Sequence, residues 1–355
     1  MPAGTPVPGG FEPGSVTFVS QETGFVIGID SACAAGSCVA VARTTDAGAS
    51  WVAIPAPIAG FVNRYSSSST APAVSEVRFA DELDGWIFGP SLFATHDGGA
   101  TWQQVKVSGS VIALETSGGY VDAVVSPCSA GQECSGALHL MQAPVSGGVF
   151  TTVLSGPVVS SSGAVGLALS LHSPAGFARL GVTDAPGLAD LYATGNLAST
   201  SSWHAFADPC ASSAGTGLDD FVAPNATDLY SLCSGSGAAG SVQKFVVKTT
   251  NGVSHVVGSP PAGGDPEALA ATASGTLVVS AASGASWLYR STDGGATWST
   301  VETENDGGIG FNDLGFTTAT QGVVIHGVPG PPANATSELL MTTDGGATWT
   351  ATPIT

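Results

Sequence analysis

The sequence is poor in charge, and above all in positive charge. Only 10% of its 355 residues are charged, and 8 Lys and Arg stand against 27 Asp and Glu, which gives a net charge of −19. Binding to nucleic acid depends on neutralising phosphates with Lys and Arg, and anionic membrane surfaces attract the same residues. The composition therefore argues against both kinds of protein and predicts no nucleic-acid partner.

Long apolar runs are absent as well. No uninterrupted apolar stretch reaches the ~18 residues of a membrane span, and segment 163–182 is interrupted by His172, Pro174 and Arg179. The first ten residues, MPAGTPVPGG, lack the basic start and apolar stretch of a secretory signal peptide. We expect no membrane insertion, and we interpret residues 1–13 as an N-terminal tail at the start of a mature, exported form.

Familiar catalytic motifs are also missing. The six histidines form no HExxH or HxH pattern, and no nucleophile elbow, phosphate loop or dinucleotide fingerprint occurs where a strand would lead into a helix. Aromatic residues make up only 7% of the chain. We therefore expect neither an organic cofactor nor a transition metal, and a Ca²⁺ ion among acidic residues has no motif to support it.

What the chain has instead is one eight-residue motif that occurs four times, at 44–51, 95–102, 291–298 and 342–349. It reads Ser/Thr-x-Asp-x-Gly-x-Ser/Thr-Trp. Asp accepts hydrogen bonds from turn N–H groups, Gly allows a positive φ, and Trp returns a large apolar surface over the hairpin. We expect a structural role for the Asp and Trp of each copy: Asp46, Trp51, Asp97, Trp102, Asp293, Trp298, Asp344 and Trp349.

These four copies resemble the Asp-box, or BNR repeat, of sialidase-type β-propellers. The resemblance implies that each box is the turn between the third and fourth strands of a blade, on the face opposite the ligand-binding mouth. The layout also resembles bacterial photosystem II assembly-factor-like and YVTN/BNR propellers, which are binding scaffolds. Sialidase chemistry would need an arginine triad, whereas Arg43 and Arg290 directly precede boxes and are expected to lie along strand surfaces.

A second pattern, a pair of apolar strands, fixes the number of repeats. It occurs seven times, or once in about 51 residues, which suits four-stranded blades. We therefore predict an all-β fold, a single seven-bladed β-propeller of four-stranded antiparallel blades over residues 14–355, with Val16, Phe18, Val77, Phe79, Leu314 and Phe316 in its core. The pairs begin within 15–28, 76–89, 111–125, 165–170, 219–233, 268–282 and 313–327.

Six cysteines allow 15 disulfide pairings. The propeller alignment prefers three local bridges on mouth-facing loops: Cys33–Cys38, Cys128–Cys134 and Cys210–Cys233. Zinc is the alternative, but these spacings are poor for structural zinc and no His pair accompanies them. Disulfides imply an oxidising compartment, so we expect an extracellular, cell-surface or periplasmic protein of bacterial type.

The propeller alignment also brings acidic residues to the starts of first strands. The candidate ligand-binding residues are Arg64, Tyr65, Glu76, Arg78, Asp219, Asp220, Glu267 and Asp313. Such a mouth could bind a cation, a cationic group or sugar hydroxyls. The alternative is that these acids are merely solvated and keep an acidic protein soluble.

Three functions remain open from the sequence. The leading hypothesis is a non-catalytic exported propeller that binds a protein or a glycan through a disulfide-pinned mouth. The second is a secreted glycoside hydrolase, in which Asp219, Asp220 and Asp313 would be the catalytic candidates because that chemistry needs two facing carboxyl groups. The third is a structural subunit of a surface assembly.

Overall fold

A computed structural model describes most of the chain. The described residues are 1–31, 38–63, 72–127, 135–160, 165–182, 191–212, 217–330 and 337–355. The chain forms two compact units: residues 1–169, 328–339 and 352–355 make the first, and residues 170–327 and 340–351 make the second. Among the described residues no helix is long and apolar enough to cross a membrane.

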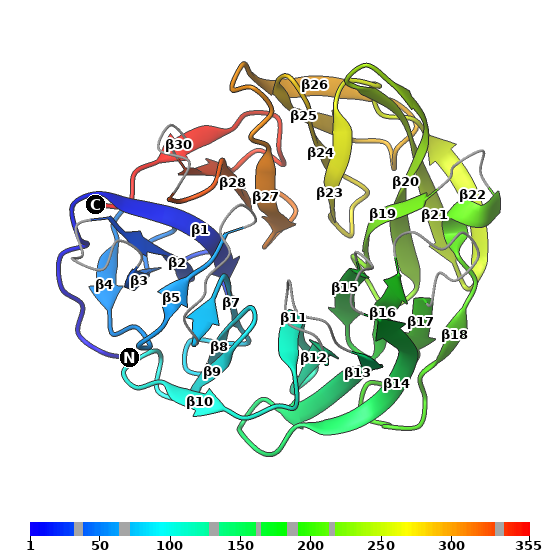
Figure 1. The fold of residues 1–355 in the computed structure, drawn as a ribbon. Helices are drawn as coiled ribbons and strands as arrows, with labels where there is room; N and C mark the ends of the chain where they lie inside the picture. The colour runs from blue at the N-terminus through cyan, green and yellow to red at the C-terminus, as the bar shows by residue number, and fades with distance from the viewer. Residues whose placement is uncertain are drawn as a thin grey trace. The chain divides into compact units, whose positions relative to one another are not determined.

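The described chain consists almost entirely of antiparallel sheets that follow one another in chain order (Figure 1). This succession of seven sheets confirms the predicted seven-bladed β-propeller. Blade one contains β1 (Phe11–Phe18), β2 (Gly24–Asp30), β3 (Cys38–Thr44), β4 (Val52–Ile54), β5 (Gly60–Phe61) and β6 (Ala73–Val74). Blade two contains β7 (Glu76–Phe79), β8 (Gly85–Phe88), β9 (Leu92–Thr95) and β10 (Gln103–Val105). Blade three contains β11 (Ser110–Ser117), β12 (Tyr120–Ser126), β13 (Ser135–Pro144) and β14 (Thr151–Ser160).

Blades four to seven each have four strands, joined by short connections along the chain. A 3₁₀ turn, η1 (Pro209–Ser212), precedes blade five. The strands are β15 (Val165–His172), β16 (Ala175–Val182), β17 (Leu191–Thr194) and β18 (His204–Phe206); β19 (Gly217–Val222), β20 (Asp228–Ala238), β21 (Ser241–Thr250) and β22 (Val253–Gly258); β23 (Asp265–Ala271), β24 (Leu277–Ala282), β25 (Ser286–Ser291) and β26 (Ser299–Glu304); and β27 (Phe311–Phe316), β28 (Gly322–His326), β29 (Glu338–Thr342) and β30 (Thr350–Thr352).

All four boxes lie between the third and fourth strands of a blade, as predicted. In the first box the Thr44 hydroxyl donates to Asp46 Oδ1 at 2.8 Å and accepts from Gly48 N at 2.9 Å, and Ser50 N donates to Asp46 Oδ1 at 2.8 Å. The other three boxes repeat these bonds around Asp97, Asp293 and Asp344. The box Asp is therefore a turn-forming acceptor, and its oxygens are used within its own hairpin.

Each box is also tied to the turn between the first two strands of its own blade. The residue after the box Asp donates its N–H to a carbonyl of that turn, for example Gly98 N to Leu83 O and Gly345 N to Thr320 O at 2.9 and 2.8 Å. In the blades with a box, a backbone bond therefore ties the first hairpin turn to the last.

Apolar faces of successive blades pack on one another inside each unit. Phe25 of blade one stacks on Phe79 of blade two with ring centroids 3.6 Å apart. Of the predicted core residues, Val16, Val77 and Phe79 are buried, whereas Phe18, Leu314 and Phe316 are half-buried. Of the box tryptophans, Trp51 and Trp349 are buried, and Trp102 and Trp298 are half-buried.

The blades without a clear box close their last hairpin in other ways. Blade four keeps a stretched box in which Thr194 Oγ1 accepts from Asn196 N at 3.0 Å, and Trp203 ends the turn in a buried position. Asn196 thus takes the place of the box Asp. Blade five uses the two-residue turn Asn251-Gly252, both at positive φ, which is the usual geometry of a tight hairpin.

The N-terminal residues differ from the expected tail. β1 begins at Phe11 instead of residue 14, and Thr5 forms an antiparallel bridge with Ala53 of β4. The segment therefore adds to blade one. Arg43, expected on a strand surface, is buried at 8% exposure.

Candidate functional site

The candidate carboxylates lie on first strands, and most sit at or beside a β-bulge. The register of β19 shifts between Leu218 and Asp220, that of β23 between Pro266 and Ala268, and that of β27 between Asn312 and Gly315. A bulge adds one unpaired residue and re-aims its side chain. Asp219, Glu267 and Asp313 are such bulge residues, which explains why polar side chains can occupy strands that otherwise pack in the core.

Two of these carboxylates join neighbouring blades of the second unit. Asp220 Oδ2 accepts a hydrogen bond from Leu269 N of blade six at 2.7 Å, and Glu267 Oε2 accepts one from Phe311 N of blade seven at 3.0 Å. In blade one, Ser15 Oγ accepts from Val77 N of blade two at 3.1 Å. Asp220 Oδ2 and Glu267 Oε2 are thus each bonded to a backbone N–H of the next blade, and ligand binding by these two residues stays a prediction.

The candidates of blade two make a different link. Arg78 Nε donates to Glu115 of blade three at 2.9 Å, and Arg78 Nη1 donates to the carbonyl of Val77. Glu76 is half-buried at the start of β7. Arg64 and Tyr65 lie outside the described residues. Arg78 is thus committed to a contact between blades, like Asp220 and Glu267.

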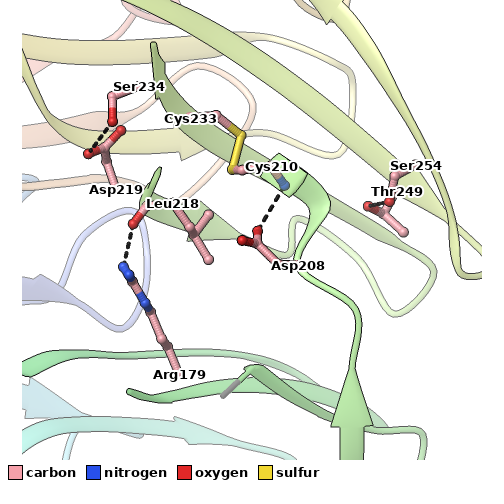
Figure 2. Close-up of a disulfide and its surroundings, with 9 residues drawn as sticks. All are labelled: Arg179, Asp208, Cys210, Leu218, Asp219, Cys233, Ser234, Thr249 and Ser254. Atoms are coloured by element: carbon pink, nitrogen blue, oxygen red, sulfur yellow. Dashed lines mark hydrogen bonds between the residues drawn. A yellow bond between two sulfur atoms is a disulfide. The ribbon is translucent and has the colours of Figure 1, made fainter. Parts of the chain in front are cut away.

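The disulfide Cys210–Cys233 is present, with Cα atoms 5.6 Å apart and both cysteines almost fully buried (Figure 2). It ties η1, in the connection from blade four to blade five, to the core of blade five. Cys233 lies inside β20, opposite Leu218, and not after the second strand as the sequence alignment placed it. Cys38 is disulfide-bonded, but Cys33, Cys128 and Cys134 lie outside the described residues.

Arg179 of β16 reaches from blade four to this disulfide-anchored region, and it was missed in the sequence. Its Nη1 donates to the carbonyl of Leu218, while its Nε is buried without a partner (Figure 2). Burial lowers the pKa of Arg179, and the negative charges of Asp219, Asp208 and Asp220 oppose that shift. The sequence gives no local pattern for this contact, because the Leu218 carbonyl lies 39 residues from Arg179 along the chain.

Asp208 and Asp219 stand on either side of the disulfide. Asp208 Oδ1 accepts from Cys210 N at 2.8 Å and so begins η1, and Asp219 Oδ1 accepts from the Ser234 hydroxyl at 3.2 Å (Figure 2). Asp219 is exposed, yet enough protein atoms surround its carboxyl group that desolvation raises its pKa to about 6. Burial raises the pKa of Asp220 to about 6 as well.

One buried cation holds the next connection between blades. The Lys244 ammonium donates to the carbonyls of Val242, Pro261 and Gly263 at 3.1, 3.2 and 2.8 Å. Burial lowers the pKa of Lys244 to about 8, against the attraction of Asp265 and Asp219. Because three carbonyls already satisfy its three donors, Lys244 fixes the linker between blades five and six.

Among the described residues of this region two acids are exposed, Asp219 and, at the start of the next first strand, Asp265. Neither belongs to a candidate metal site, since the described residues contain no group of three or more His, Cys, Asp or Glu side chains that could hold a metal ion. An accessible carboxylate beside a partly satisfied guanidinium can accept hydrogen bonds from a cationic or hydroxyl-bearing ligand.

Comparison with known proteins agrees with the repeat and the fold. Residues 289–300, which contain the third box, match the model of the BNR/Asp-box repeat. A search of the curated proteins found no match to the chain. The described fold and the matched repeat define an Asp-box β-propeller.

Several solved structures are similar to this chain, all at low identity. YCF48 bound to D1 peptide is 16% identical, with a TM-score of 0.49 and coverage of 78% of this chain and 80% of that one. The WD40 β-propeller domain of Doa1 is 8% identical, with a TM-score of 0.54 and coverage of 96% and 95%. A prolyl endopeptidase is 12% identical, with a TM-score of 0.60, and this chain spans 49% of it. These likenesses extend to the fold alone.

Proposed function

We propose that the protein is a non-catalytic binding propeller that holds a cationic segment of a protein ligand beside Asp219. The observation that carries the proposal is the difference between the first-strand acids: Asp220 and Glu267 are bonded to neighbouring backbone, whereas Asp219 is exposed. With a net charge of −19, the chain as a whole also attracts positively charged partners.

Export to an oxidising compartment is part of the proposal. It is supported by the buried Cys210–Cys233 bridge and by the bonded Cys38. Such bridges persist outside the reducing cytosol. The bridge, together with Asp208 as the cap of η1, fixes the backbone on which Asp219 stands, so binding would need no reordering of that strand.

The ligand contact proposed here uses neither a metal ion nor a cofactor. Asp219 would accept hydrogen bonds from an ammonium or guanidinium group, and Ser234 would orient the carboxylate. Binding should therefore survive a chelator such as EDTA, and a loss of binding on chelation would contradict this part of the proposal.

A glycoside hydrolase stays the second candidate, because one observation favours it. A carboxyl group whose pKa is raised to about 6 can serve as a general acid near neutral pH, and Asp219 has this property. The second carboxylate would have to come from Asp313, since Asp220 is bonded to the backbone of blade six. A glycan ligand is the corresponding alternative for a pure binding function.

Calorimetric titration with lysine-rich and glutamate-rich peptides tests the proposal. We expect binding of the lysine-rich peptide at pH 7.5, a clear loss at pH 5.0 where Asp219 is protonated, and a similar loss in Asp219→Asn at pH 7.5. Asp265→Asn is the matched control for net charge. Equal binding by the wild type and Asp219→Asn would show that the site lies elsewhere.

A further inference from the structure

Residues 1–8, which we call the N-terminal strap, lie against the fourth strand of blade one. Thr5 N donates to Ala53 O at 2.9 Å, and Ala53 N donates to Thr5 O at 2.8 Å. The strap passes so close to β4 that a Cβ on Gly4 would lie 2.3 Å from two carbon atoms of Val52. The outer edge of blade one, at Val52 and Ala53, is therefore a binding seat for an extended segment that has Gly where it passes Val52.

Arg43, on the neighbouring strand β3, is the second contact of the strap. Its Nη2 donates to Pro2 O at 3.1 Å, while its buried Nε and Nη1 have no partner. Met1 covers the second box, since a Cβ on Gly98 would lie 3.0 Å from Met1 Cγ. Arg43 is thus a buried guanidinium that depends on a carbonyl from the strap.

Arg290, at the same place in the repeat, has a different acceptor. It too directly precedes a box, but its Nε and Nη2 donate to Gly345 O and Asp344 O, at 2.6 and 3.4 Å, in the box of the next blade. A Cβ on Gly345 would lie 3.6 Å from Arg290 Nη2, so this guanidinium covers the glycine that corresponds to Gly98. In blade one, Arg43 instead donates to Pro2 O of the strap.

In the repeat, the carbonyls of Asp97 and Gly98 correspond to the two acceptors of Arg290, Asp344 O and Gly345 O. If the strap leaves, Arg43 can donate to the carbonyls of Asp97 and Gly98, as Arg290 does to Asp344 and Gly345. The buried Arg43 guanidinium would then keep hydrogen-bond acceptors after the strap has left. Leaving a buried charge without a partner is the main cost of removing its partner. Departure of the strap would chiefly cost the two backbone bonds to Ala53.

The strap is mostly exposed and is joined to β1 through two glycines. Thr5 and most other strap residues are exposed, and the turn Gly9-Gly10, with Gly10 at φ 86°, joins the strap to β1. We propose that straps exchange between copies of this chain, so that Thr5 of one copy pairs with Ala53 of a second. The strap is the segment whose Gly4 and Thr5 fit this edge of blade one, and exchanging an identical element is a low-cost route to association.

A disulfide trap tests strap exchange. Residues of an antiparallel pair that exchange both backbone bonds have Cα atoms about 5.5 Å apart, which is within the range of a disulfide. Thr5→Cys in one chain and Ala53→Cys in a second, differently tagged chain should give a linked pair after mixing and mild oxidation. Val253→Cys, at an exposed residue on the fourth strand of blade five, replaces Ala53→Cys as the control for random collision.

The double variant Thr5→Cys/Ala53→Cys should close its bridge within one chain and confirm the seat. Adding Gly4→Val to the Thr5→Cys chain should abolish the linked pair, because the added carbons would overlap Val52. A closed bridge in the double variant with no linked pair above the Val253→Cys control would overturn exchange between copies. Failure of the double variant to close would overturn the seat as well.

Discussion

At the scale of single residues, the acids divide by what their oxygens touch. Asp293 and Asp344 accept two or more bonds inside their boxes, and these bonds, led by those from Thr297 and Thr348, lower the pKa of both carboxyl groups to about 2. Asp122 of β12 is buried and is bonded only to Gln142 among the contacts described, so desolvation raises its pKa to about 7. The same side chain type thus favours folding in one place and opposes it in the other.

Asp122→Asn should stabilise the protein above neutral pH. The folded pKa of about 7 exceeds the unfolded value near 4, so the folded state keeps the proton between them and loses stability as the pH rises through 7. One pKa unit corresponds to ~1.4 kcal/mol; since the amide also has to be desolvated, we expect a gain on the order of 2 kcal/mol at pH 8. Urea unfolding at pH 8 and pH 4 measures it, and an equal effect at both pH values would contradict the assignment.

Asp220→Ala should destabilise the protein more than Asp219→Ala. Removing Asp220 leaves the Leu269 N–H without its acceptor, which costs about 1–3 kcal/mol. Asp219 is exposed and is hydrogen-bonded by Ser234 of its own blade, so its loss should stay within ~0.5 kcal/mol. Urea midpoints of the two variants decide the point, and equal losses would mean that Asp220 does not join blades five and six.

At the scale of elements, the second unit fixes its inter-blade connections with three different chemistries. A disulfide anchors the connection before blade five, the Lys244 ammonium binds the connection before blade six, and Asp306 bonds both Ser286 and His326 before blade seven. The disulfide does so covalently, whereas Lys244 and Asp306 satisfy polar groups of the backbone or of side chains. Such fixed connections let a chain with few charged residues keep its first strands in place.

Replacing Cys210 and Cys233 together by Ala should cost about 2–4 kcal/mol, because the bridge closes a loop between residues 23 apart. Both sulfur atoms are buried, so mild reductant should not reach the bridge in the folded protein. The check is the urea midpoint of the double variant beside that of the wild type with and without reductant. If mild reductant lowers the urea midpoint of the wild type while the protein stays folded without urea, the bridge is accessible in the folded state.

Regular repeats were predictable from the sequence, whereas contacts between repeats were not. The boxes were found because Thr44, Asp46 and Ser50 satisfy one another within seven residues, and local bonds leave a local pattern. The inter-blade bonds of Asp220 and Glu267 were not predicted, because they depend on the N–H groups of Leu269 and Phe311, more than forty residues away. Arg179 was missed for the same reason.

At the scale of the whole molecule, the opposite pKa shifts should give a stability maximum at mildly acid pH. The lowered groups, such as Asp293 and Asp344, contribute stability that is complete above the unfolded pKa near 4 and is lost as the pH falls towards 2. The raised groups Asp122, Asp219 and Asp220 withdraw stability as the pH rises from 4 to 7. Urea midpoints between pH 3 and 8 should therefore peak near pH 4–5, and a steady rise up to pH 8 would contradict the balance described.

The most direct test of the central claim is incubation of the oxidised protein with a mixed library of cationic peptides and plant, microbial and sialylated glycans, followed by mass spectrometry of bound and cleaved species. The account predicts capture of cationic peptides without cleavage, reduced in Asp219→Asn and retained in Asp265→Asn. Cleavage of a glycan that is lost in Asp219→Asn or Asp313→Asn would contradict it and make the protein a hydrolase.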